Sequence, residues 1–97
     1  MSKPKKPWWG FIRNIIKTYP NNEQPEANEA VQEAVAYTLT LENGQDRMKV
    51  VELYLMKRTH TIHGAALKTY YSEAAVKKYS QQFIREVAKR FKSNGLY

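Results

Sequence analysis

The sequence predicts an all-α protein built from short helices. Apolar residues recur at three- and four-residue spacing in five segments, which is the period of amphipathic helices. No segment alternates apolar and polar residues over the length of a strand, and no internal repeat is present. Proline, glycine and asparagine separate the periodic segments, as expected for helices joined by short turns.

The first helix is expected at residues 8–19, and Pro20 ends it because proline cannot continue a helix. The polar stretch 20–25 is expected to be a linker. A second helix is expected at residues 26–41, with acids in its early turns and Asn43-Gly44 as its stop. The apolar stripes of these two helices are Trp8, Ile12, Ile15, Ile16 and Tyr19, and Ala27, Ala30, Val31, Ala34, Val35, Thr38 and Leu39.

A third helix is expected at residues 45–58. Thr61 is the predicted N-cap of a short helix at 62–70, and Ser72 is that of a long helix from 73 to about 92, closed by Asn94-Gly95. The core-facing residues of these three helices are Met48, Val51, Leu53, Tyr54 and Leu55; Ile62, Ala65 and Ala66; and Val76, Tyr79, Phe83, Val87 and Phe91.

Composition limits the class of protein. The 97 residues suffice for one domain with a modest core. Without cysteine the chain has no disulfide and no thiolate metal site, which suits a reducing compartment. No apolar stretch approaches the 20 or so residues that span a bilayer, and Arg13-Asn14 interrupt the apolar part of the basic N-terminal lead. We expect a soluble, cytoplasmic protein without membrane contact.

The net charge of +7 is unevenly distributed along the chain. Residues 1–22 contain five bases and no acid, whereas residues 23–46 contain six acids and no base. Residues 47–97 contain eleven bases and three acids. Such a basic half indicates a polyanion-facing surface, although the same charges also occur on ordinary solvated faces.

The last two predicted helices form a candidate helix-turn-helix over about residues 61–92. Only Tyr70, Tyr71 and the Ser72 cap are available for the turn, so the helices must cross steeply. The paired alanines Ala65 and Ala66 allow close approach of the second helix, and the preceding helix covers the open side.

The outward face of the long helix carries residues suited to reading DNA. Lysine pairs with guanine or phosphate, glutamine pairs with adenine, and alanine can contact a thymine methyl group. Glu73 can accept from cytosine or merely stabilise the first helical turn. Exposed helix positions are commonly Lys, Gln and Glu in any case, so the pattern also fits a plain solvated face. The candidate DNA contacts are Thr61, Ser72, Glu73, Ala74, Lys77, Lys78, Gln81 and Arg85, with Lys57, Arg58 and Lys68 as candidate phosphate contacts.

Residues 61–79, T-I-H-G-A-A-L-K-T-Y-Y-S-E-A-A-V-K-K-Y, resemble the helix-turn-helix of sigma-factor region 4 without gaps. Two positions depart from that pattern: Thr69 replaces a large apolar residue, and Tyr70 replaces glycine or a small polar residue. The positions that match the pattern are Thr61, Ile62, Ala66, Ser72 and Val76.

The chain as a whole resembles phage-encoded regulators of the RinA/ArpU type. The parts that carry this resemblance are WWGFIRNIIKTYP, the acidic helix and the basic block from Asn43 to Phe91. The similarity covers nearly the whole chain, with a shorter linker. It implies a sigma-like activator of phage late or packaging genes that works with RNA polymerase in a bacterial host cell. It also implies DNA contacts by Glu73, Ala74, Lys77 and Lys78, with Thr61 on a phosphate.

We therefore predict a sequence-specific regulator of double-stranded DNA whose recognition helix, at about residues 73–91, enters the major groove. Residues 1–25 would form a basic arm with a Trp-rich helix and a linker, and residues 26–97 the DNA-binding domain. Neither catalysis nor a cofactor is expected, since no nucleophile–base–acid set or Gly-rich phosphate loop is evident. His60 and His63 lack the companions of a metal site.

Two other functions remain open at this point: a small terminase-like DNA-packaging protein, and an interaction module whose basic face binds an acidic protein. Trp8, Trp9 and Phe11 also admit three roles. They can cover the core, contact a second copy or RNA polymerase, or lie on a membrane surface.

Overall fold

The computed structural model describes the backbone of residues 9–93 and the side chains of residues 10–91. Within that part the protein is all-α, as predicted, and contains no strand. The elements are α1 (Trp9–Thr18), α2 (Pro25–Leu39), α3 (Gly44–Val51), the π-helical segment η1 (Glu52–Met56), α4 (Ile62–Thr69) and α5 (Glu73–Ser93). The predicted closure at Asn94-Gly95 lies outside the described residues.

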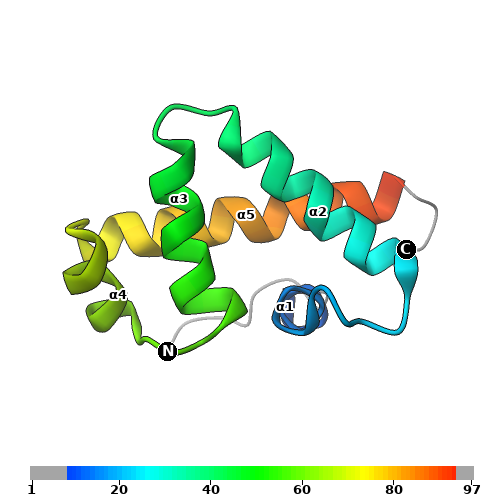
Figure 1. The fold of residues 1–97 in the computed structure, drawn as a ribbon, viewed down its shortest axis with the longest axis horizontal. Coiled ribbons are helices and arrows are strands. Elements are labelled where there is room, and N and C mark those ends of the chain that lie inside the picture. The colour runs from blue at the N-terminus through cyan, green and yellow to red at the C-terminus, as the bar shows by residue number, and fades with distance from the viewer. Residues whose placement is uncertain (1–8, 94–97) are drawn as a thin grey trace.

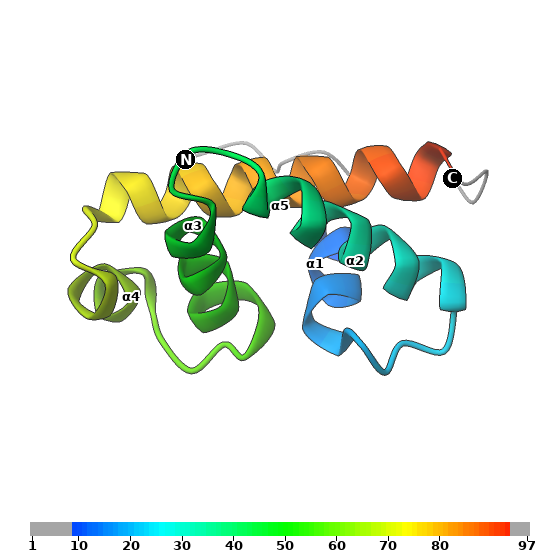
Figure 2. The ribbon, with the colours of Figure 1, turned by 45° about the horizontal axis from the view of Figure 1, so that its top comes forward.

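Helix α5 is the element on which the others are assembled. It runs along the length of the molecule, and α1, α2, α3 and α4 each pack against it (Figures 1 and 2). α4 lies near the N-terminal end of α5, and α2 crosses its C-terminal half (Figure 1). The linker predicted at 20–25 is held against α2 by Asn28. The Asn28 side chain donates to the Asn22 carbonyl at 2.9 Å and accepts from the Asn22 N–H at 3.2 Å.

The interior consists of two apolar cores that share α5. The larger core joins α1, α2, η1 and the C-terminal half of α5, and the smaller one joins α3, α4 and the first turns of α5. Adjacent residues Val50 and Val51 are both fully buried, one in each core, so α3 lies between the two. Because this helix is buried on two sides, its sequence carries no single apolar stripe, and Val50 was not predicted as a core residue.

The predicted core faces are largely confirmed, with Leu39 as an exception. The α2 residues Ala27, Ala30, Val31, Ala34 and Thr38 are buried, whereas Leu39 is 48% exposed. Leu39 follows Thr38 by about 100° around the helix, which carries its side chain off the buried stripe. On α5, Ile84 and Ala88 are buried in addition to the predicted Val76, Phe83, Val87 and Phe91.

The helix predicted at 45–58 is shorter and changes its hydrogen-bond pattern. After Val51 the chain widens into η1, in which the Lys57 N–H donates to the Glu52 carbonyl at 2.8 Å. Arg58 then adopts a left-handed backbone with φ of 54°, and the Thr59 N–H donates back to the Leu53 carbonyl at 3.1 Å. Helix propensity cannot signal such a π-helical end, because it depends on how η1 fits between its neighbours.

The turn between α2 and α3 depends on Gly44 for close packing. Asn43 takes the left-handed conformation, with φ of 58°, so Gly44 opens α3 and does not serve as the stop of α2. A Cβ atom on Gly44 would lie 2.5 Å from the Thr38 carbonyl oxygen and 2.8 Å from the Leu39 backbone. Only glycine therefore lets the start of α3 approach the end of α2.

Gly44→Ala is expected to lower the free energy of unfolding by about 2 kcal/mol, since a backbone atom cannot move aside as a side chain would. Urea denaturation followed by circular dichroism measures this change. Gly10→Ala in α1 is the matched control: nothing lies within 4 Å of its added Cβ, and alanine favours the helix by up to about 1 kcal/mol. An equal response of the two variants would contradict the close approach at Gly44.

Candidate nucleic-acid interface

Helices α4 and α5 are joined by the three residues Tyr70, Tyr71 and Ser72, and both N-termini are capped as predicted. The Thr61 hydroxyl accepts from the Gly64 N–H at 3.0 Å, and the Ser72 hydroxyl accepts from the Ala75 N–H at 3.1 Å. The buried alanines Ala65 and Ala66 of α4 lie against Val76 of α5. Small side chains on α4 thus bring the two helices together.

Tyr70 ends α4 one residue earlier than predicted. It adopts a left-handed backbone with φ of 65°, and its side chain is 96% exposed. This is the helix-ending position that usually favours glycine. Tyr70, which stands where the sigma-factor pattern has glycine or a small polar residue, therefore adopts the backbone conformation that glycine favours. Its ring projects into solvent.

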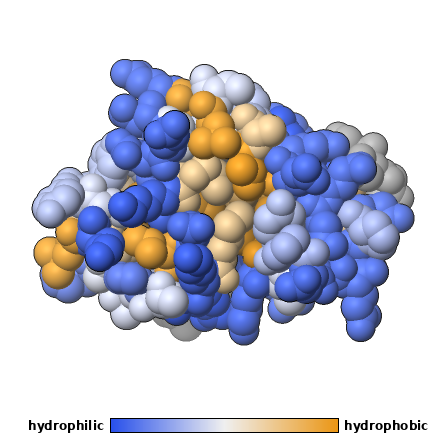
Figure 3. Space-filling view, viewed as in Figure 1, coloured by the Kyte–Doolittle hydropathy of each residue, from blue (hydrophilic) through white to orange (hydrophobic). Residues whose placement is uncertain are grey.

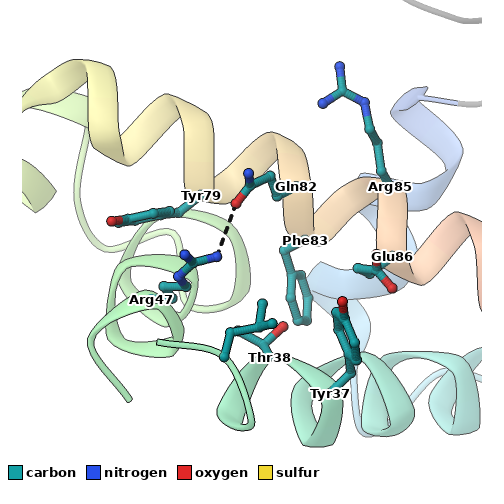
Figure 4. A pocket seen from close by; sticks show the side chains of 9 residues that line it. Tyr37, Thr38, Arg47, Tyr79, Gln82, Phe83, Arg85 and Glu86 are labelled. Atoms are coloured by element: carbon teal, nitrogen blue, oxygen red, sulfur yellow. Dashed lines mark hydrogen bonds between the residues drawn. The ribbon is translucent and has the colours of Figure 1, made fainter. Parts of the chain in front are cut away.

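A chain of contacts from α3 holds the turn and the first half of α5. The Tyr71 hydroxyl donates to the Asp46 carboxylate at 2.9 Å, and the Tyr71 ring meets the Tyr79 ring edge-on at 5.6 Å. The Arg47 guanidinium lies 4.8 Å from the Tyr79 ring centre and donates to the Gln82 side chain at 3.3 Å (Figure 4). These contacts fix the position of α5 relative to α3.

Neither Asp46 nor Arg47 was predicted from the sequence as part of this arrangement. Their polar character fits an exposed first turn equally well, and their partners lie 25 and 35 residues away in the chain. The Arg47 Nε atom is buried and lacks a hydrogen-bond partner among the described residues. Through the Tyr71 hydrogen bond, the Asp46 carboxylate raises the pKa of the Tyr71 phenol above its ordinary value.

The outward face of α5 that is predicted to read DNA, here called the reading face, consists of Ala74, Lys77, Lys78 and Gln81. It is largely open to solvent. Ala74, Lys77 and Lys78 are exposed, and Gln81 is half-buried. Within the described part of the chain, no ion pair joins Lys77 or Lys78 to a carboxylate. Arg85 is also exposed and lines the edge of the hollow between α2, α3 and α5, and in Figure 4 its guanidinium is directed away from Tyr37 and Thr38.

Glu73, for which the sequence left two roles open, contacts α4. Its carboxylate lies 2.8 Å from the Nδ1 atom of His63, so it connects the first turns of the two helices. The pair is exposed and lies beside the reading face. The His63 partner was not predicted, because ten residues and a turn separate the two side chains.

The candidate phosphate contacts lie in different places. Lys57 is 4.0 Å from Glu52, whereas Arg58 lines a surface hollow together with Thr61 and His63. Lys68 is exposed on α4, roughly 140° around the helix from His63, and lines none of the hollows described here. Arg58 and Thr61 are therefore brought together, and Lys68 lies apart from them.

The predicted partner contacts on the first helix are only partly covered by the structure. Trp8 lies outside the described residues, and Trp9 begins α1 with a side chain that also lies outside them. Phe11 is 48% exposed, and its ring meets Phe91 of α5 edge-on at 5.7 Å. The same helix buries Ile12, Ile15 and Ile16 in the larger core.

A second surface feature lies between α2 and α3. On the face shown in Figure 3, an apolar band separates two hydrophilic areas over these helices. A hollow of about 220 Å³ lies between α2, α3 and α5, lined by Tyr37, Arg47, Tyr79 and Glu86 among others (Figure 4). Its lining includes both charges, so it lacks the uniform sign expected of a phosphate site.

Tyr71→Phe is expected to destabilise the protein below about pH 10, because it removes the hydrogen bond to Asp46. The pKa of Tyr71 is raised in the folded state, so the extra stability of the parent chain is fully present below the pKa of this phenol in the unfolded chain. The extra stability is lost as the pH rises through the raised pKa. Urea unfolding midpoints at pH 7 and in alkali measure this difference between the parent chain and Tyr71→Phe. Tyr70→Phe, at an exposed tyrosine, is the control. Equal midpoints of both variants at pH 7 would contradict the contact.

Among the described side chains, no group of three or more His, Cys, Asp or Glu residues could hold a metal ion. The helices of the described chain are all too short or too polar to cross a membrane. The chain matches no protein-family model, no curated protein and no solved structure.

Proposed function

We propose that this protein is a sequence-specific regulator that binds double-stranded DNA. In this proposal α4 and α5 act as a helix-turn-helix, and the N-terminal turns of α5 enter the major groove. The observation that carries it is the pair of lysines, Lys77 and Lys78, exposed beside Ala74 on the first turns of α5 without a carboxylate partner among the described residues.

The arrangement around α5 supports this role physically. A recognition helix must be held rigidly for its side chains to meet base edges in one register. The contacts from Asp46 to Tyr71 and from Arg47 to Tyr79 and Gln82 restrain α5 from one side. Close packing of α4 restrains it from another, and the reading face stays open.

The contacts divide into base-reading and phosphate-binding groups. Ala74, Lys77, Lys78 and Gln81 would face base edges, while Thr61, Arg58 and Arg85 would hold phosphates and set the register. Glu73 would mainly act through its His63 contact, which joins the helix starts at the interface.

The regulatory output follows from the resemblance to RinA/ArpU-type regulators. We propose activation of phage late or packaging genes, through contact with RNA polymerase, in the cytoplasm of a bacterial host. The protein would act without a cofactor and without catalysing a reaction. Binding as a homodimer would show as two half-sites in the selected DNA.

Selection from a randomised duplex library at about 150 mM salt tests the proposal, because weak phosphate-only binding is suppressed at that salt. The parent chain is expected to recover one shared motif. Lys77→Ala and Lys78→Ala should each relax the motif, with a loss of about 1–3 kcal/mol of discrimination for a base-contacting lysine.

Lys89→Ala is the control, and it removes a lysine whose ammonium lies 3.7 Å from the Glu86 carboxylate. It lies on the same helix, about 18 Å further along at 1.5 Å per residue. This variant should recover the parental motif. A parent chain that recovers no motif would overturn the proposed function, and a Lys77→Ala chain with the parental motif would show that the reading face is wrongly assigned.

A further inference from the structure

Three adjoining surface hollows lie between α1, η1, the start of α4 and α5, and the side chain of Arg13 lines all three. Their volumes are about 340, 580 and 270 Å³. We call this surface the basic groove. The Lys, Arg and His residues of its lining are Arg13, Lys17, Arg58, His60, His63 and Lys77.

The residues that line the groove carry a single sign of charge, and one of them, His63, lies 2.8 Å from the Glu73 carboxylate outside the lining. Asp and Glu are absent from the lining of the three hollows. In the described part of the chain, no ion pair connects Arg13, Lys17 or Arg58 to a carboxylate. Clustered like charges repel one another, so this surface is complementary to a polyanion.

Two cations of the groove, Arg13 and Arg58, lie beside the π-helical segment η1. The Arg13 guanidinium lies 5.7 Å from the Tyr54 ring centre, an aromatic contact that orients the side chain across η1. Arg58 follows η1 in the left-handed conformation, with φ of 54°. Both π-helical segments and strained backbone are frequent at functional sites.

The groove is continuous with the reading face of α5. Lys77 and Gln81 belong to that face and also line the hollow of about 340 Å³, one of the three that Arg13 lines. A major groove is flanked by phosphate strands, so a duplex read by α5 would carry one strand beside this edge. The cations of α1 and Arg58 are placed to meet it.

We propose that the basic groove binds the phosphate backbone of the duplex read by α5, with Arg13 and Lys17 of α1 as phosphate contacts. The inference rests on the proposed function, because it places the groove beside a base-reading helix. It makes α1 a part of the DNA interface.

The test is the salt dependence of affinity for two duplexes, one with the selected motif and one with that motif scrambled. The slope of log K against log salt is negative, and Lys17→Gln and Arg13→Gln should each make it less negative by about 0.9. Each variant should lower the affinity for both duplexes by the same factor and leave the selected motif unchanged. Lys17 is exposed, so its variant should keep the parental circular dichroism spectrum.

Lys89→Gln, which removes one charge outside the groove, should leave the slope unchanged. Unchanged slopes for Lys17→Gln and Arg13→Gln, in a parent chain that selects a motif, would overturn the groove and leave the proposed function standing. If the parent selects no motif but Lys17→Gln makes its salt slope less negative, the groove stands as a phosphate-binding surface and the sequence-specific function is overturned. A parent that binds neither duplex would overturn both and favour an acidic protein as the ligand of the basic face.

Discussion

The structure depends on the burial of one face of α5. Val76 near its start packs into the smaller core, and Phe83, Val87 and Phe91 pack into the larger one. All four other α-helices of the described chain contact this single helix. Loss of apolar contact at either end of α5 would therefore release helices at that end, because burial of apolar area supplies most of the stability. The opposite face of α5 is left free to carry the exposed lysines.

Apolar burial alone does not determine how far α5 is rotated about its axis, because it is not directional: a small rotation would still leave an apolar side chain against each core. The polar contacts from α3 remove this freedom: Tyr71 is bound to Asp46, and Arg47 lies on Tyr79. Directional contacts of this kind add specificity to a small core. They also connect the shape of the turn to the orientation of the reading face, so the same contacts serve stability and the proposed recognition.

Much of the fold was predictable because it follows from local patterns. The periodic apolar residues of α2 and α5 indicated their buried faces, and Thr61 and Ser72 indicated two helix starts that the structure confirms. The end of the third helix was not predictable, since η1 and the left-handed Arg58 depend on tertiary packing. For the candidate site, local patterns identify the exposed side chains of α5. They cannot show that Arg13 and Lys77 line the same hollow, because that arrangement arises only when α1 packs on α5.

The placement of α1 changes how the charge distribution is understood. In the sequence, Arg13 and Lys17 belong to a basic stretch separated from the basic C-terminal half by six acids. In the structure, Ile12, Ile15 and Ile16 anchor α1 in the larger core, so its cations lie beside Arg58, and no acid of α2 lines the groove. The acidic helix therefore separates the two basic blocks along the chain but does not enter the groove in which Arg13, Lys17 and Arg58 meet. The cations of α1 thus add to the electrostatic attraction of the surface that carries the reading face.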